Sequence, residues 1–98
     1  LGTANMSFFV YMIGTKVKNR TISYVGYTNN IKKRLSLHNS SKGAKFTRGK
    51  IWKLIYKRKF KSKIDAMKYE YVLKKDKPKR EFLKKKYQNE AIKNYSHN

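Results

Sequence analysis

Two tyrosines stand in short apolar runs near the start of the chain, Tyr11 in FFVYMIG and Tyr24 in ISYVGY. Arg34 and His38 follow four residues apart, and Glu70 lies farther along between aromatic residues. A guanidinium can bind two phosphate oxygens at once, and an imidazole titrates near neutral pH. If folding gathers these side chains, they have the chemistry to hold a phosphate group and to move a proton.

Taken one at a time, these residues also have ordinary structural explanations. The chain holds eight tyrosines, and a strand tyrosine is usually a packing residue with a hydrated hydroxyl. Glu70 has Lys74 four residues later, a common helix-surface pair worth about 0.2–0.5 kcal/mol. Arg34 alone is one cation among many, and His38 alone is a partly buried helix histidine. Only their combination favours a functional site.

Three segments have the character of strands. Residues 7–13 are an apolar and aromatic run without helical spacing, and residues 21–27 resume that character after the polar loop GTKVKNR. This hairpin pattern places Tyr11 and Tyr24 on adjacent antiparallel strands. Residues 51–60 alternate in part and predict a third strand, whose lysines suit a sheet edge.

The segment TNNIKKRLSLHNSSKG predicts a helix of about three turns. Thr28 or Asn29 is the expected cap, and Gly43 or the preceding pair of serines is the expected end. On a helical wheel, Arg34 and His38 fall on one side, at the edge of the apolar face. We therefore expect both side chains beside the core.

Two further helices are predicted. Ser62 followed by Asp65 has the form of an N-terminal cap, and residues 63–75 behind it have helical propensity. Pro78 suits the first turn of a third helix, which runs to about Tyr87. The predicted fold is α+β, in the order β-β-α-β-α-α, with a small three-stranded mixed sheet flanked by helices.

Charge dominates the composition. The 98 residues include 26 Lys and Arg against 5 Asp and Glu, a formal net charge of +21, so the chain attracts polyanions. We expect DNA as the partner, with RNA as the second choice, and no membrane, because no window reaches the roughly 18–20 apolar residues of a spanning helix. The lack of cysteine excludes a disulfide framework, a thiolate nucleophile and a cysteine zinc site.

The chain length fits a single domain with one modest core. LGTAN ahead of Met6 is interpreted as a remnant of an expression vector, so residues 1–5 are set aside. Residues 6–90 are expected to form the domain and residues 91–98 a polar C-terminal tail. We expect a cytoplasmic protein that is a monomer or a weak homodimer.

In order, FVY at 9–11, YVG at 24–26, KKRLSLH at 32–38 and a glutamate in the next helix resemble the GIY-YIG nuclease superfamily. Within it, GYTNNIKKRLSLHNSSKGAKFTRGK followed by AMKYEYVLKK is most similar to small standalone bacterial proteins. These are related to the nuclease domain of the excision-repair incision subunit. The resemblance runs from about Phe8 to Tyr87.

The resemblance implies a DNA endonuclease of little sequence specificity, which uses one Mg²⁺ or Mn²⁺ and leaves 5′-phosphate and 3′-hydroxyl ends. A role in DNA repair and a preference for single strands or branched structures are further implications. Carried over, Tyr11 and Tyr24 are the motif tyrosines, Arg34 binds phosphate and Glu70 is the metal ligand. Tyr11 is assigned as the base, with Tyr24 and His38 orienting water or phosphate, although the two tyrosines can exchange these roles.

Basic residues around the first helix are expected to form a track for the nucleic-acid backbone, without sequence readout. They are Lys32, Lys33, Lys42, Lys45, Arg48 and Lys50. The chain departs from the family pattern at Phe9, which replaces a glycine, and at Tyr27, where many relatives carry a lysine. The second change removes a cation near the reacting phosphate. The alternative function is therefore a basic nucleic-acid-binding module without catalysis, in DNA repair or RNA metabolism.

Overall fold

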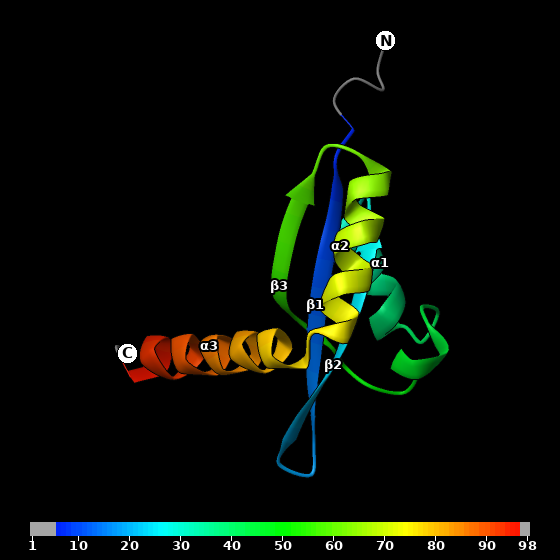
Figure 1. The fold of residues 1–98 in the computed structure, drawn as a ribbon. Helices are drawn as coiled ribbons and strands as arrows, with labels where there is room; N and C mark the ends of the chain where they lie inside the picture. Colours follow the sequence, from blue (N-terminus) through cyan, green and yellow to red (C-terminus); the bar gives the residue numbers. More distant parts are fainter. Residues whose placement is uncertain (1–5, 97–98) are drawn as a thin grey trace.

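The chain forms three strands and three α-helices in the order β-β-α-β-α-α (Figure 1), which confirms the predicted α+β fold class. The structure is a computed structural model that describes residues 6–96. The interpreted vector remnant at 1–5 and the last two residues of the expected tail lie outside the described residues.

The sheet is built on a hairpin. β1 (Phe8–Val17) and β2 (Arg20–Thr28) are paired antiparallel up to the turn, and only Lys18 and Asn19 connect them. Both turn residues have positive φ, 51° and 68°, the conformation that matches the twist of a two-residue hairpin. The strands are longer than the predicted 7–13 and 21–27 because polar residues near the turn continue the pairing beyond the core.

β3 (Lys53–Phe60) pairs with the other edge of β1, which gives the strand order β2-β1-β3. Both pairs are antiparallel, whereas a mixed sheet was expected. The reason is visible in Figure 1: α1 (Ile31–Asn39) carries the chain back along the sheet, so β3 starts at the same end as β2. The strand between them runs opposite to both.

The start of α1 differs from the prediction by one or two residues. The N-cap is Asn30, whose side chain accepts a hydrogen bond from the backbone N–H of Lys33 at 3.0 Å. Thr28 does not cap the helix, because its hydroxyl instead accepts from the backbone N–H of Asn30 and tightens the turn after β2. The helix ends at the serine pair, as predicted.

The other two helices begin where the sequence indicated. α2 (Lys63–Lys75) starts after Ser62, whose hydroxyl accepts from the backbone N–H of Asp65 at 3.1 Å. This confirms the predicted cap. α3 (Lys77–Ser96) follows after one residue, with Pro78 in its first turn.

Helices cover both faces of the sheet, with α2 in front of it and α1 behind it in Figure 1. Since alternate residues of a strand face opposite sides, β1 contributes to both layers, and buried residues form two clusters where one core was expected. The α2 side holds Val10, Met12, Val25, Ala66, Leu73 and Leu83. The α1 side holds Tyr11, Ile13 and Trp52, with Ile31 and Leu35 packed against them.

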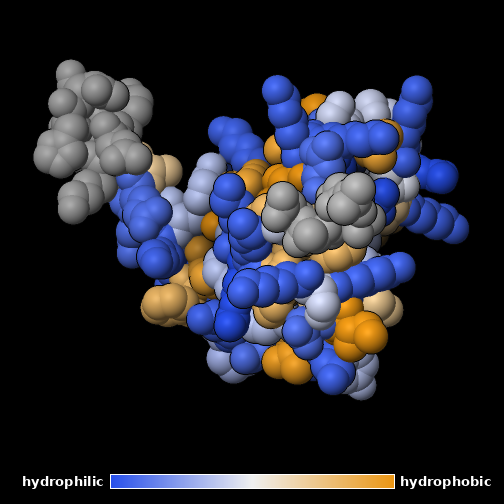
Figure 2. Space-filling model, turned by 90° about the horizontal axis from the view of Figure 1, so that it is seen from above, coloured by the Kyte–Doolittle hydropathy of each residue, from blue (hydrophilic) through white to orange (hydrophobic). Residues whose placement is uncertain are grey.

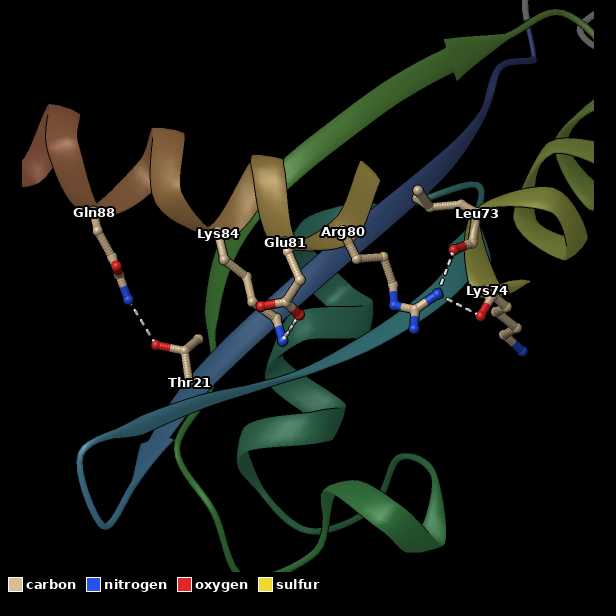
Figure 3. Close-up of polar contacts among 7 residues, drawn as sticks. All are labelled: Thr21, Leu73, Lys74, Arg80, Glu81, Lys84 and Gln88. Carbon is tan, nitrogen blue, oxygen red and sulfur yellow. Dashed lines mark hydrogen bonds and ion pairs between the residues drawn. The ribbon is translucent and has the colours of Figure 1, made fainter. Parts of the chain in front are cut away.

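α3 extends sideways from the sheet (Figure 1), and the molecule measures 47 × 30 × 27 Å along its principal axes. Figure 3 shows how it is attached. Arg80 donates hydrogen bonds to the carbonyls of Leu73 and Lys74 at the end of α2. Farther along, the Gln88 amide donates to the Thr21 hydroxyl of β2 at 2.9 Å. These contacts fix the helix to both α2 and the hairpin.

The face seen in Figure 2 is predominantly hydrophilic, with apolar patches between projecting hydrophilic side chains. One exposed apolar strip lies on the outer side of α2, at Ile64, Met67 and Tyr71. No helix within residues 6–96 combines the length and the apolar character needed to cross a membrane.

Candidate active site

The first contact of the predicted site joins Tyr11 of β1 to His38 in the last turn of α1. The Tyr11 hydroxyl lies 2.7 Å from Nε2 of His38. Tyr11 is 2% exposed and His38 is fully buried, so the histidine lies inside the core and not at its edge, where the helical wheel placed it. Close packing holds both rings in this geometry.

A third buried side chain, Thr47, orients the His38 ring. Thr47 ends the short 3-10 helix η2 (Lys45–Thr47), and its Oγ1 lies 2.8 Å from Nδ1 of His38. Its single hydroxyl proton is donated to the Ala44 carbonyl at 2.8 Å, so Oγ1 can only accept from His38. This network places the imidazole proton on Nδ1, and Nε2 accepts the proton of the Tyr11 hydroxyl.

Two glycines make room for this pair of rings. Gly26 lies opposite Tyr11 in the strand register, and a Cβ at Gly26 would lie 2.5 Å from the Tyr11 hydroxyl oxygen. A Cβ at Gly43 would lie 2.5 Å from Nδ1 of His38. Both distances are far shorter than a van der Waals contact. Any larger residue at either position would therefore displace a site ring.

Tyr24 of β2 lies against the same histidine. The ring centroids of Tyr24 and His38 are 5.1 Å apart. The ring of Phe46, in η2, stacks on Tyr24 at 6.3 Å with 21° between the planes. Phe46 is 53% exposed, and the sequence analysis did not single it out.

Arg34 of α1 lies beside the Tyr11 hydroxyl. As a hydrogen-bond acceptor for the guanidinium, the phenol raises the pKa of Arg34, which stays charged. The Nε atom of Arg34 is buried, and no acceptor among residues 6–96 pairs with it. Buried N–H groups without a partner are rare in folded proteins. A phosphate oxygen bound at this position would supply the missing acceptor.

The burial of these groups sets their protonation. Burial raises the pKa of Tyr11, and the adjacent Arg34 charge offsets part of that rise. Burial also lowers the pKa of His38, as does the positive charge of Arg34. At neutral pH the phenol is therefore protonated and the imidazole is neutral. These are the states that the hydrogen bond from Tyr11 to Nε2 requires.

Glu70 approaches the site from α2. It lies on the side of the helix that carries the buried Ala66 and Leu73, and its side chain is 18% exposed. Its carboxylate is 3.5 Å from the Lys74 amine, the pair expected from the sequence. The negative charge of Glu70 contributes to the raised pKa of Tyr11, so the two groups are within electrostatic range.

The fit of a divalent cation can be judged from these donors. Within the described part of the chain, no three His, Cys, Asp or Glu side chains are grouped so as to enclose a metal ion. Glu70 offers a partly exposed, hard carboxylate oxygen. That fits Mg²⁺, which often takes one or two protein carboxylates and completes its shell with water and substrate phosphate.

A cleft of about 300 Å³ lies along β2, the edge strand next to these residues. Its walls come from both layers, since Phe46 belongs to the α1 side and Lys74 to α2. The lining residues are Ser23, Tyr24, Val25, Phe46, Lys74 and Arg80.

The predicted basic track divides into two parts. Lys32 and Lys33 lie on the exposed side of α1. The other four lie on the segment between α1 and β3, where all but Lys50 are exposed: Lys42, Lys45, Arg48 and Lys50. The Lys50 amine lies over the Phe46 ring, 5.8 Å from its centroid.

That segment is not a free loop. Asn39 at the end of α1 binds both backbone polar groups of Trp52, at 3.1 and 2.6 Å. The buried Trp52 indole donates to the Thr47 carbonyl at 2.9 Å. These bonds fix the chain around His38, although the sequence analysis described it only as a glycine-containing basic loop.

Comparison with known families gives a match that covers most of the chain. The family model described as the GIY-YIG catalytic domain matches residues 7–89. This range includes every residue of the site described above.

Comparison with individual proteins finds relatives in several bacteria. The chain is 51% identical over 63 residues to a UPF0213 protein of Streptococcus pneumoniae, a match that covers 61% of this chain and 64% of the relative. It is 55% identical over 53 residues to a UPF0213 protein of Bacillus licheniformis, covering 53% and 55%. The chain thus spans between about half and two thirds of the length of these relatives.

Among solved structures, a solution NMR structure of the UPF0213 protein BH0048 from Bacillus halodurans matches 80% of this chain and 82% of its own. The two sequences are 38% identical, and the TM-score is 0.46.

Proposed function

Because this chain belongs to the GIY-YIG family, we propose that it is an endonuclease that hydrolyses phosphodiester bonds in DNA with little sequence specificity. The observation that carries the proposal is the buried contact series from Tyr11 through His38 to Thr47, with Arg34 beside the phenol. A basic DNA-binding surface does not need such a series. A role in DNA repair in the cytoplasm belongs to the same proposal.

The contact series supports a proton relay. Tyr11 is 2% exposed, so the proposed partner of its hydroxyl in the relay is a small molecule, the attacking water. As the water oxygen forms its bond to phosphorus, the water gives a proton to the Tyr11 oxygen, and Tyr11 gives its own proton to Nε2 of His38. His38 ends as an imidazolium, still bound to Thr47 through Nδ1. No free phenolate is needed, although the pKa of Tyr11 is raised.

Arg34 handles the charge of the phosphoryl group in this proposal. Its guanidinium is permanently charged and can hold two oxygens of one phosphate, and its Nε atom already lacks a protein acceptor among the described residues. As negative charge grows on the phosphoryl oxygens, a fixed donor stabilises it. The bond from phosphorus to the 3′ oxygen then breaks, and the departing oxygen takes a proton from solvent.

Glu70 is the proposed ligand of Mg²⁺ or Mn²⁺. When bound, the ion would neutralise charge on the phosphoryl and departing oxygens. The Lys74 amine now at 3.5 Å from the carboxylate would give up this contact and remain available for a neighbouring phosphate. The net charge of +21 and the predicted basic track would supply most of the affinity for DNA, without sequence readout.

A cleavage assay tests the proposal. Single-stranded, duplex and branched DNA are incubated with the full chain and Mg²⁺, and in parallel with chelator. We expect cleavage that chelator abolishes and that Glu70→Ala and Arg34→Ala each reduce on the order of 100-fold or more. Glu90→Ala, which removes an exposed carboxylate of α3, is the matched control and should cut normally.

Two results would overturn the proposal. One is DNA binding without cleavage on any substrate and with either metal, which is the behaviour of a non-catalytic basic module. The other is cleavage that survives Glu70→Ala and Arg34→Ala, which would indicate a contaminating nuclease or a different site. Circular dichroism of each variant shows whether it is folded.

A further inference from the structure

We propose that Phe46 is a platform on which an unpaired base of the substrate stacks, so that the site selects single-stranded or locally opened nucleic acid. The inference rests on the proposed function for the chemistry next to Phe46, but it concerns binding and has its own readout. Phe46 is an exposed aromatic ring that stacks on Tyr24, next to the residues of the relay.

Exposure alone does not distinguish Phe46, since several apolar side chains of this protein are exposed. Its surroundings do. Phe46 stacks on Tyr24 and also lies 6.1 Å from the Trp52 ring, so the phenyl group packs against two aromatic neighbours. Its neighbour in sequence, Thr47, is fully buried and bound to His38. The exposed ring is therefore fixed in position relative to the histidine.

The charge around Phe46 suits a nucleotide. The Lys50 amine lies 5.8 Å from the ring centroid, and Lys45 and Arg48 are exposed on the same short segment. A platform of aromatic rings bordered by cations is the arrangement with which proteins bind single strands, the rings taking bases and the cations taking phosphates.

The cleft gives the platform its place in the site. Phe46 and Tyr24 line the same cleft of about 300 Å³ along β2, and Tyr24 lies against His38. A base on Phe46 would bring its nucleotide to the wall of the cleft that Tyr24 shares with the proposed relay. In a duplex, both faces of a base are covered by its stacked neighbours, so the platform is available only to a base that has left the stack.

The test measures binding in the presence of chelator, so that no cleavage occurs. The probes are a labelled single strand, the same sequence as a blunt duplex, and a strand of equal length built from abasic nucleotides. We expect Phe46→Ala to weaken binding of the single strand roughly 10-fold or more. Binding of the duplex and of the abasic strand should change little, because only phosphates are contacted there.

The chain supplies a matched control. Phe82 of α3 is 59% exposed and has the Lys79 amine 5.8 Å from its ring centroid, as Phe46 has Lys50. Phe82→Ala should leave all three affinities unchanged. Phe46→Trp should keep the affinity for single strands, whereas Phe46→Leu, which retains apolar bulk without a ring, should lose it. Comparing Phe46→Trp with Phe46→Leu distinguishes the loss of base stacking from the loss of apolar packing.

Fluorescence gives a second readout. Trp52 is the only tryptophan of the chain, and its ring lies 6.1 Å from that of Phe46. Its emission should change when the single strand binds and should change less with the abasic strand.

Two results would overturn the inference. In one, Phe46→Ala and Phe82→Ala behave alike. In the other, Phe46→Ala weakens the binding of all three probes by the same factor. Cleavage is scored separately, so loss of the platform and loss of the nuclease proposal remain distinguishable. If Phe46 binds single strands selectively but no DNA is cleaved, the nuclease proposal is wrong and the stacking platform stands.

Discussion

At the scale of single residues, Thr47 determines which nitrogen of His38 can accept a proton. Its hydroxyl gives its only proton to Ala44 and so accepts from Nδ1. The motifs predicted Tyr11, Tyr24, Arg34 and His38 as site residues, because these lie at fixed spacings on regular elements. They could not predict Thr47, since a threonine nine residues after a histidine in an aperiodic segment carries no local signal. Phe46 was missed for the same reason.

Replacing Thr47 tests its role as a positioning residue. Thr47→Val keeps the shape of the side chain but leaves the buried Nδ1–H group without an acceptor, so we expect a loss of stability of about 1–3 kcal/mol. The proton should then redistribute between the two ring nitrogens, and cleavage should fall. Denaturant unfolding and ¹⁵N NMR of the imidazole measure the two effects.

Thr47→Ser provides the comparison, because it retains the hydroxyl. It should keep the tautomer and most of the activity. An unchanged tautomer in Thr47→Val would show that the protein around His38, and not Thr47, fixes the proton.

At the scale of elements, the hairpin was predictable because apolar strands flank a short polar turn. The start of α2 was predictable because Ser62 is a typical N-cap residue. The direction of β3 relative to β1 was not predictable, since it depends on how far α1 carries the chain back along the sheet. The helical wheel placed His38 at the edge of the core but did not indicate that the side chain is fully buried. That follows from the bonds between Asn39 and Trp52, which close the following segment over the helix end.

The packing of the hairpin makes Gly26 a sensitive position. In Gly26→Ala the added methyl group would lie 2.5 Å from the Tyr11 hydroxyl oxygen, so the phenol must move away from His38. We expect a folded protein whose cleavage rate falls on the order of 100-fold. The measurement is cleavage together with the NMR signal of the His38 ring.

Gly14 of the same hairpin is the matched control. A Cβ there would meet no atom closer than 3.3 Å, and that atom belongs to the flexible end of Ile55. Gly14→Ala should retain the Tyr11–His38 contact. Equal losses in both variants would mean that strand glycines matter for folding alone.

At the scale of the whole molecule, charge and burial act on stability together. The chain has 26 Lys and Arg but only 5 Asp and Glu, so few carboxylates titrate on acidification and the histidines dominate between about pH 5 and 7. Burial lowers the pKa of His38 in the folded state. The unfolded chain therefore binds a proton at His38 at a higher pH than the folded protein does.

The free energy of unfolding should consequently be highest above the unfolded pKa of 6.5 and fall as the pH drops below it. The fall should level off once the folded His38 is itself protonated. Urea unfolding between pH 8 and pH 5 measures how the free energy of unfolding changes with pH. An NMR titration of His38 in a His97→Gln background shows whether His38 causes that change. A His38 that titrates above 6.5, or a flat stability profile, would contradict the burial argument.

The sheet separates the two tasks of the proposed site. Proton handling belongs to residues packed on the α1 face, Tyr11, His38 and Thr47, whereas the carboxylate of Glu70 comes from α2 on the opposite face. Substitutions on the α1 face would therefore change the proposed proton relay, and substitutions around Glu70 would change the proposed binding of a cation. The two sets of residues can thus be substituted separately, but the charge of Glu70 still acts on the pKa of Tyr11 across the sheet.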